Sequence, residues 1–163
     1  MKSKGIGAAA FIVDEEGSVL LVRHTYGRLN WELPGGGAEN DESPVETALR
    51  EVREETGLEV EAHHMTGCYY APGNDSLHFV FWCKQTDTCA VPVPDRAEIS
   101  ECRFWSPDAL PRPISDWTVL RIKDALAGKR FELPTPIGER IWPSPRSRPR
   151  ARPGCRSSGR AGG

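Results

Sequence analysis

Long hydrophobic runs and paired cysteines are both missing from this sequence of 163 residues. No apolar run approaches the roughly 18 residues that a membrane-spanning helix needs, so we expect no association with a membrane. The cysteines are five in number, an odd count, and stand at Cys68, Cys83, Cys89, Cys102 and Cys155. None forms a Cys-x-x-Cys pair, which argues against both a disulfide framework and a zinc site. We therefore predict reduced thiols in a cytoplasmic protein.

The N-terminus also lacks the marks of a cleaved leader. Its apolar stretch, residues 5–13, is short and is followed directly by Asp14, Glu15 and Glu16. No small-residue cleavage site accompanies it. We interpret this stretch as a first β-strand.

Basic residues are scarce outside the C-terminal segment. Residues 143–163 contain six arginines and no acid, which leaves a net charge of −8 on the other 142 residues of a chain whose total is −2. An acidic body argues against a broad nucleic-acid-binding face. The segment is rich in Arg, Pro, Ser and Gly and has no aliphatic side chains to bury, so we predict a folded domain over 1–142 and a disordered tail over 143–163. An RNA-directed role for this tail is the alternative.

The clearest helix signal covers residues 44–56. Ser43 and Glu46 form the pattern of a capping box, and Pro44 occupies the first helical position, where its missing N–H is harmless. Gly57 is a natural C-terminal stop. Apolar side chains recur at helical spacing and predict a buried face, formed by Val45, Ala48, Leu49, Val52 and the Thr56 methyl group.

Three glutamates of this helix, Glu51, Glu54 and Glu55, fall together on a different face. Clustered carboxylates repel one another, and a hard divalent cation with oxygen ligands, magnesium or manganese, would remove the repulsion. The alternative is an acidic face in contact with solvent. The glycine-rich segment 35–37 and the capped helix start favour the metal-binding interpretation.

The remaining pattern interleaves strands with one more helix. Residues 6–13 and 18–24, joined by a polar link with Gly17, predict a β-hairpin. A second amphipathic helix is predicted over 115–127, with Trp117, Leu120, Ile122 and Leu126 on or near its buried side. Further strands are expected at 59–70 and 77–84, residues 31–33 are expected to be a short extended piece, and residues 98–105 end in a short apolar segment. The order of elements predicts an α/β architecture with a mixed sheet between helical layers.

Residues 36–58 carry a fixed spacing that resembles the Nudix box, the signature of the Nudix hydrolases. The matching positions are Gly36, Glu42, Arg50, Glu51, Glu54, Glu55 and Gly57. The resemblance implies an α/β/α sandwich with a central mixed β-sheet. It also implies hydrolysis of a nucleoside diphosphate linked to another group, with water attacking phosphorus beside a metal ion. Asp41 departs from the glycine that many members carry before Glu42, and aspartate accommodates an unusual φ better than most residues.

The same resemblance implies roles for individual residues. The metal ligands would be Glu51, Glu54 and Glu55, with the Gly35 carbonyl as a further ligand. Gly36, Glu42, Arg50 and Gly57 would support the loop and helix, with an Arg50–Glu42 ion pair between the two. For the general base, the loop acid Glu98 is favoured, followed by Glu101, and Glu54 is the alternative from within the helix. A surface carboxylate is the other interpretation of Glu98.

Substrate recognition must come from outside residues 36–58. Arg23 could hold a phosphate as a planar donor, or form a surface ion pair. Trp31 could stack on a base, as could Tyr69, Tyr70 and Phe79, although aromatic residues at strand spacing are more often part of the core.

We expect a magnesium- or manganese-dependent hydrolase that converts a nucleoside triphosphate to a monophosphate and pyrophosphate. ADP-ribose or another sugar nucleotide is the alternative substrate, and a non-catalytic nucleotide sensor is the alternative class. The expected partner is a small nucleoside diphosphate derivative rather than nucleic acid. A homodimer is left open.

Overall fold

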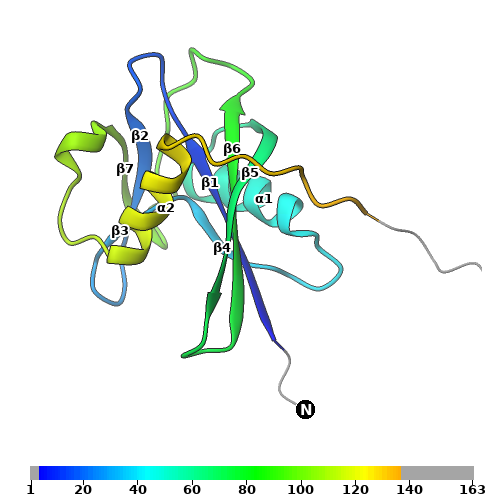
Figure 1. The fold of residues 1–163 in the computed structure, drawn as a ribbon. Helices are drawn as coiled ribbons and strands as arrows, with labels where there is room; N and C mark the ends of the chain where they lie inside the picture. Colours follow the sequence, from blue (N-terminus) through cyan, green and yellow to red (C-terminus); the bar gives the residue numbers. More distant parts are fainter. Residues whose placement is uncertain (1–3, 137–163) are drawn as a thin grey trace, which may run out of the picture.

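The computed structural model describes residues 4–136 of the chain, and the predicted tail over 143–163 lies outside them, as does Cys155. Two helices and one 3-10 turn accompany the strands, in an order close to the predicted one (Figure 1). The strands are β1 (Gly5–Ile12), β2 (Val19–His24), β3 (Trp31–Glu32), β4 (Gly35–Gly37), β5 (Val60–Ala71), β6 (Ser76–Gln85) and β7 (Ile99–Trp105). The helices are α1 (Pro44–Thr56) and α2 (Asp116–Leu126), with the 3-10 turn η1 at Pro107–Ala109.

The strands form two sheets rather than the single central sheet that the sequence predicts. One sheet has the order β4-β1-β6-β5 and is mixed, because β1 and β6 are parallel while the other pairs are antiparallel. The second has the order β3-β2-β7 and is antiparallel. The predicted β1–β2 hairpin is therefore wrong beyond its first rung, the bridge between Val13 and Val19. The chain reverses there, but the two strands then diverge into different sheets.

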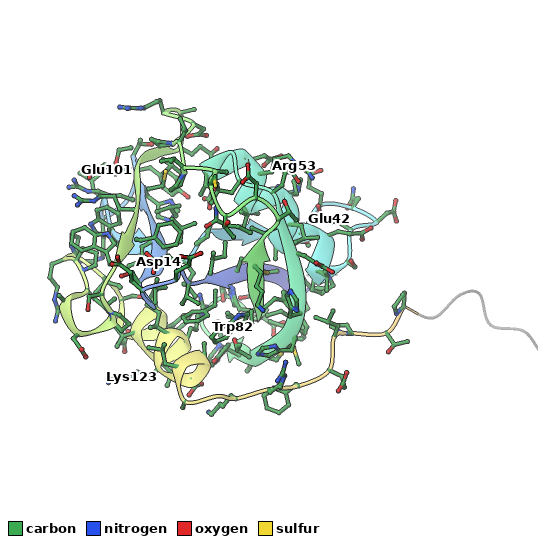
Figure 2. All side chains as sticks on the ribbon, turned by 90° about the horizontal axis from the view of Figure 1, so that it is seen from above. Asp14, Glu42, Arg53, Trp82, Glu101 and Lys123 are labelled. Atoms are coloured by element: carbon green, nitrogen blue, oxygen red, sulfur yellow. The ribbon has the colours of Figure 1, made fainter. Side chains whose placement is uncertain are left out.

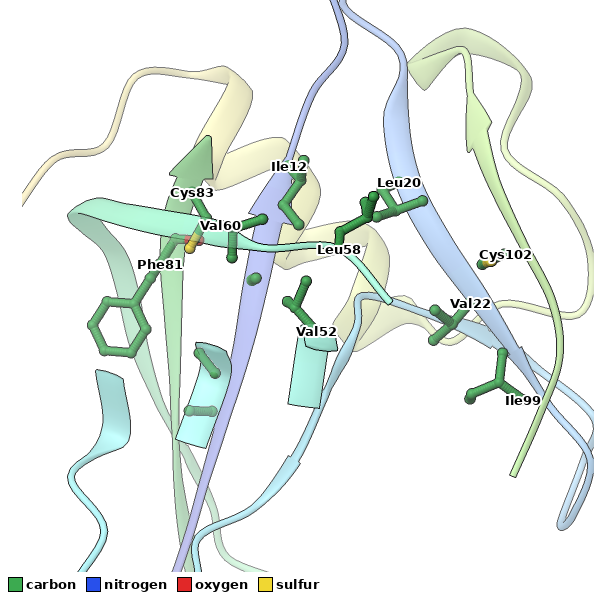
Figure 3. Packing of buried hydrophobic residues seen from close by; sticks show 13 residues of the cluster. Ile12, Leu20, Val22, Val52, Leu58, Val60, Phe81, Cys83, Ile99 and Cys102 are labelled. Carbon is green, nitrogen blue, oxygen red and sulfur yellow. The ribbon is translucent and has the colours of Figure 1, made fainter. Parts of the chain in front are cut away.

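Alternation along β1 explains how the fold is layered. Ala8, Ala10 and Ile12 belong to one buried cluster, together with Val52 of α1 (Figure 3). Ala9 and Phe11 point to the opposite face and belong to a second buried cluster with Ile122 and Ala125 of α2. Because successive strand residues face opposite sides, a fully buried strand must be apolar throughout.

The two helices accordingly cover opposite sides of the strands. Figure 2 shows α1, which carries Arg53, on one side and α2, which carries Lys123, on the other. This arrangement confirms the predicted α/β class with helical layers on both sides of the strands. No helix within residues 4–136 has the length and apolar character needed to cross a bilayer.

Helix α1 begins and ends as predicted. The Ser43 hydroxyl accepts a hydrogen bond from the Glu46 N–H, the Glu46 carboxylate accepts one from the Ser43 N–H, and Gly57 has a left-handed φ of 68°. Its buried face is wider than the apolar pattern indicates, because Thr47 and Glu55 are also buried. Before the helix, Asp41 has a φ of 65°, which agrees with the left-handed conformation that its position suggests.

Helix α2 presents a different face to the core from the one predicted. Trp117, Leu120 and Leu126 are 51%, 50% and 45% exposed, whereas the buried residues are Thr118, Arg121, Ile122 and Ala125. These four stand at i, i+3, i+4 and i+7, so the helical period was right but its phase was wrong. An arginine consequently lies on the buried side.

Candidate active site

The glycine-rich strand β4 lies against β1 so closely that two of its residues have no space for a side chain. A Cβ on Gly35 would stand 2.6 Å from the Cα of Ala9, and one on Gly36 would stand 2.6 Å from the Cδ of Glu51. None of the three glycines adopts a left-handed φ, so close approach, and not backbone freedom, is what β4 requires of glycine here. The backbone of β4 is thereby brought against the acidic face of α1.

Arg50 links strand β4, the loop between β4 and α1, and α1 itself. Its guanidinium donates to both oxygens of Glu42, at 2.7 and 3.0 Å, and to the Gly37 carbonyl at 3.0 Å. The same group donates to Glu51 at 2.9 Å and to Glu54 at 3.0 Å. The Arg50 and Glu42 side chains are only 19% and 12% exposed, so the pair is shielded from solvent. Arg50 therefore neutralises part of the carboxylate charge and fixes the loop that carries Glu42.

Glu55 is the most buried carboxylate of α1, at 6% exposed. Its Oε2 accepts a hydrogen bond of 2.9 Å from the Gly35 N–H, which ties the helix to β4. Burial raises the pKa of Glu55 to about 8; the Gly35 hydrogen bond opposes the shift, and the negative charges of Glu51, Asp95 and Glu98 add to it. A buried carboxylate in this setting lacks a matching positive charge.

Burial also raises the pKa of Glu51, although Arg50 opposes the shift. The charges of Glu54 and Glu98 contribute to the upward shift of Glu51. The structure thus brings the loop that carries Glu98 within electrostatic range of Glu51 and Glu55, which are more than 40 residues earlier in the chain. Glu98 itself is exposed, while its backbone N–H donates to Asp95.

The acidic face fits a hard divalent cation in the chemistry of its donors and in its charge. Carboxylate oxygens are the ligands that magnesium and manganese prefer, and a bound cation would oppose the rise in pKa that burial and neighbouring acids cause at Glu51 and Glu55. Within residues 4–136, however, no three His, Cys, Asp or Glu side chains converge as a finished metal site. Arg50 donates to Glu51 and Glu54, and the Gly35 N–H donates to Glu55, so each carboxylate of the acidic face is held by a donor.

A cavity of about 490 Å³ opens beside the glycines. Its walls include Gly35–Gly37 from β4, residues 5–9 of β1 and, at α2, Trp117 and Arg121. Glu51 lies against Gly36, so β4 is the element that the acidic face of α1 and this cavity share, although no residue of α1 lines the cavity itself. The volume is in the range of pockets that hold small ligands.

Two residues predicted to bind substrate have protein partners in this structure. Trp31 is 4% exposed and packs edge-on against Trp105, with ring centroids 5.3 Å apart, so it is a core residue and cannot stack on a ligand in this conformation. Arg23 forms an ion pair of 2.9 Å with Glu101 on the second sheet and is not among the residues that line the cavity. Glu101, the second candidate for the general base, is therefore held in an ion pair with Arg23.

Four cavity residues carry side chains that could hydrogen-bond to or stack on a ligand, and the sequence pattern did not single them out as site candidates. They are Glu32, His78, Trp117 and Arg121. One signal was available, since an arginine in register with Thr118, Ile122 and Ala125 marks a charged group on a buried helical stripe. The other three have no spacing that distinguishes them from surface or core residues.

The sequence and the fold both match known proteins. The model of the NUDIX domain family matches residues 3–123. A "MutT-like protein" from Streptomyces ambofaciens is 30% identical over 139 residues, which cover 85% of this chain and 88% of that protein. The "Phosphatase NudJ" of Escherichia coli K12 is 30% identical over 141 residues, with 82% of this chain and 91% of NudJ covered.

Solved structures agree with this match. A NUDIX hydrolase from Nitrosomonas europaea superposes with a TM-score of 0.68 at 27% identity, covering 80% of this chain and 94% of that one. An ADP-ribose pyrophosphatase from Streptococcus suis superposes with a TM-score of 0.67, also at 27% identity, with 80% and 96% covered. The chain belongs to the Nudix family and is a Nudix hydrolase.

Proposed function

We propose that this Nudix hydrolase cleaves the diphosphate bond of a nucleoside triphosphate and releases a nucleoside monophosphate and pyrophosphate, using Mg²⁺ or Mn²⁺. One observation carries the proposal. Glu51 and Glu55 of α1 contact a glycine strand in which Gly35 and Gly36 leave no room for a side chain, and that strand lines a cavity of about 490 Å³. A bare backbone next to carboxylates suits an anionic diphosphate only if a cation lies between them.

Glu51, Glu54 and Glu55 would hold the cation, with the Gly35 carbonyl as a further ligand. When bound, the cation supplies charge neutralisation for the diphosphate and polarises its oxygens. Glu54 has the freest side chain of the three, at 57% exposed. Arg50 keeps Glu51 and Glu54 oriented, since it donates to both.

Glu98 is the favoured general base and Glu54 the alternative. The base accepts a proton from the water whose oxygen forms the new bond to the α-phosphorus. The bond from that phosphorus to the bridging oxygen breaks, and the bridging oxygen leaves with pyrophosphate. Glu98 suits this role because it is exposed to water and its charge reaches Glu51 and Glu55.

A sugar nucleotide such as ADP-ribose is the second candidate substrate. The structural likeness to an ADP-ribose pyrophosphatase at 27% identity favours it. Both candidates carry a diphosphate linked to a nucleoside, and they differ in what the cavity must hold beyond that diphosphate.

The deciding experiment is a panel of nucleoside triphosphates and sugar nucleotides incubated with the purified chain and Mg²⁺. Products would be separated by anion-exchange chromatography, with chelator and Mn²⁺ arms in parallel. The proposal predicts monophosphate and pyrophosphate from a triphosphate, and no product with chelator. Release of orthophosphate from a triphosphate, or exclusive turnover of sugar nucleotides, would contradict it.

A further inference from the structure

Arg121 is a buried cation that the reaction outlined above does not use. It lies on the inner side of α2 and is 8% exposed. Within residues 4–136 no hydrogen bond or ion pair to its guanidinium is formed, and the guanidinium carbon lies 5.7 Å from the centroid of the Tyr69 ring. The guanidinium faces two open cavities and is not among the buried polar atoms that lack a partner, so its donors have no protein acceptor but can be reached from the cavities. Such a group is explained if a ligand completes it.

The position of Arg121 indicates where that ligand would lie. Together with Trp117 and His78, it lines both the cavity of about 490 Å³ and an adjoining cavity of about 280 Å³. The larger cavity reaches the glycine strand that adjoins α1, and α1 and α2 cover opposite sides of the strands (Figure 2). A substrate whose diphosphate lies at Gly35–Gly37 would therefore extend its remaining part toward Arg121.

Glu32 supplies an acceptor in the same cavity. Its Oε1 accepts a hydrogen bond of 2.9 Å from the hydroxyl of Thr118, which is fully buried on α2. The charge of Glu32 raises the pKa of Arg121 while burial lowers it, yet the two side chains form no ion pair. The cavity is thus lined by the guanidinium of Arg121, which can only donate hydrogen bonds, and by the carboxylate of Glu32, which can only accept them.

This pair discriminates between kinds of ligand. A second phosphate would gain from Arg121 but would be repelled by Glu32. A planar ring with a carbonyl oxygen beside a ring N–H satisfies both residues, and the half-exposed Trp117 offers a face for stacking. In the same orientation, adenine and cytosine present an amino group to Arg121 and an unprotonated nitrogen to Glu32, so both contacts would be lost.

We propose that Arg121 and Glu32 select nucleotides whose base has a lactam edge: the base carbonyl accepts from Arg121 and the adjacent ring N–H donates to Glu32. The proposal rests on the proposed function for the placement of the diphosphate. It assigns specificity to α2 and β3, whereas the bond that is cut is determined by α1 and β4.

The test uses two matched pairs of nucleotides that differ mainly at this edge, ITP against ATP and UTP against CTP. For the wild-type chain, kcat/KM is expected to favour the lactam member of each pair by about tenfold or more. Arg121→Gln is expected to bring both ratios close to one, mainly by lowering turnover of ITP and UTP. Lys123→Gln, an exposed position on α2 outside both cavities, is the control and should keep the wild-type ratios.

Binding without turnover separates this proposal from the proposed function. Calorimetric titration of ITP and ATP with Ca²⁺ in place of Mg²⁺ keeps a hard cation beside the phosphates and reports base preference even if no nucleotide is hydrolysed. Preference for ITP that is lost in Arg121→Gln would support the inference, whether or not hydrolysis is observed. Equal affinity for ITP and ATP in the wild-type chain would overturn it, as would an Arg121→Gln variant that keeps both the fold and the preference. Arg121→Lys, which keeps the charge but loses the planar fork, replaces Arg121→Gln if that variant does not fold.

Discussion

The carboxylate of Glu51 occupies the space that a side chain on Gly36 would need. Two residues 15 positions apart are therefore dependent on each other: the strand can approach the helix only because Gly36 has no Cβ. This contact joins the part of the site that suits a diphosphate to the part that suits a cation.

Gly36→Ala is expected to displace Glu51 and to lower kcat/KM by at least about tenfold, because small errors in the position of reacting groups have large effects on rate. The added methyl group should also reduce the free energy of unfolding by about 1–3 kcal/mol. Steady-state kinetics and urea unfolding measure the two effects. Gly37→Ala is the matched control, since a Cβ there meets nothing within 4 Å and its φ is not left-handed. Equal losses in both variants would contradict the Glu51–Gly36 contact.

Replacing Arg50 should destabilise the chain far more than replacing Arg53, three residues away on the same helix. Arg50→Gln leaves Glu42, Glu51 and Glu54 without their shared cation, and we expect a loss of about 3 kcal/mol. Arg53 pairs with Glu59, and both side chains are 59% exposed, so Arg53→Gln should change the free energy of unfolding little, because solvent screens an exposed ion pair. Urea unfolding of both variants provides the comparison, and similar losses would show that Arg50 is not the hub of the network.

The Glu42–Arg50 pair also predicts how stability depends on pH. Hydrogen bonds from Arg50 lower the pKa of Glu42 to about 2 in the folded chain. A lowered folded-state pKa contributes stability above the unfolded value near 4.5, and that contribution is lost as pH falls through about 2. The free energy of unfolding of the wild-type protein should therefore exceed that of Glu42→Gln by about 2–3 kcal/mol at pH 7. This difference should disappear as the pH falls from 4.5 to 2. A difference that stays constant across this range would contradict the pairing.

The identity of the base can be settled by comparing three glutamates. Glu98→Gln is expected to lower kcat by about 100-fold and to flatten the acidic limb of the pH–rate profile. Glu101→Gln should leave both nearly unchanged, because Glu101 is engaged by Arg23 on the second sheet. If Glu54→Gln removes the acidic limb and Glu98→Gln does not, the base lies on α1.

Local signals in the sequence identify α1 well. Ser43, Pro44 and Gly57 act on their immediate neighbours, so the ends of the helix follow from local chemistry alone. The β1–β2 hairpin illustrates the opposite case. The pattern of β1 marks a strand but does not reveal that it pairs with β6, more than 60 residues later, instead of with the strand that follows it.

The residues of the site also differ in whether local sequence determines their position or distant packing does. The glutamates of α1 stand at a fixed spacing within one helix and could be grouped from the sequence. Trp31 could not be assigned, because a tryptophan next to a glycine-rich loop looks the same whether it meets a ligand or Trp105. Trp117 and Leu120 look like core residues but line the cavities, and Arg121 looks like a surface residue but is buried. Only the packing of α2 against the strands distinguishes these cases.

The most direct test of the account is the behaviour of Glu55→Gln. The amide can still accept the Gly35 hydrogen bond, and it removes a carboxyl group whose ionisation is opposed by burial, so in chelator the variant should unfold at the same urea concentration as wild type or a higher one. Its hydrolysis of the preferred triphosphate in Mg²⁺ should fall by at least about 100-fold, because a cation ligand is lost. A folded Glu55→Gln variant with wild-type turnover and unchanged dependence on Mg²⁺ would contradict the assignment of α1 as the metal-binding element.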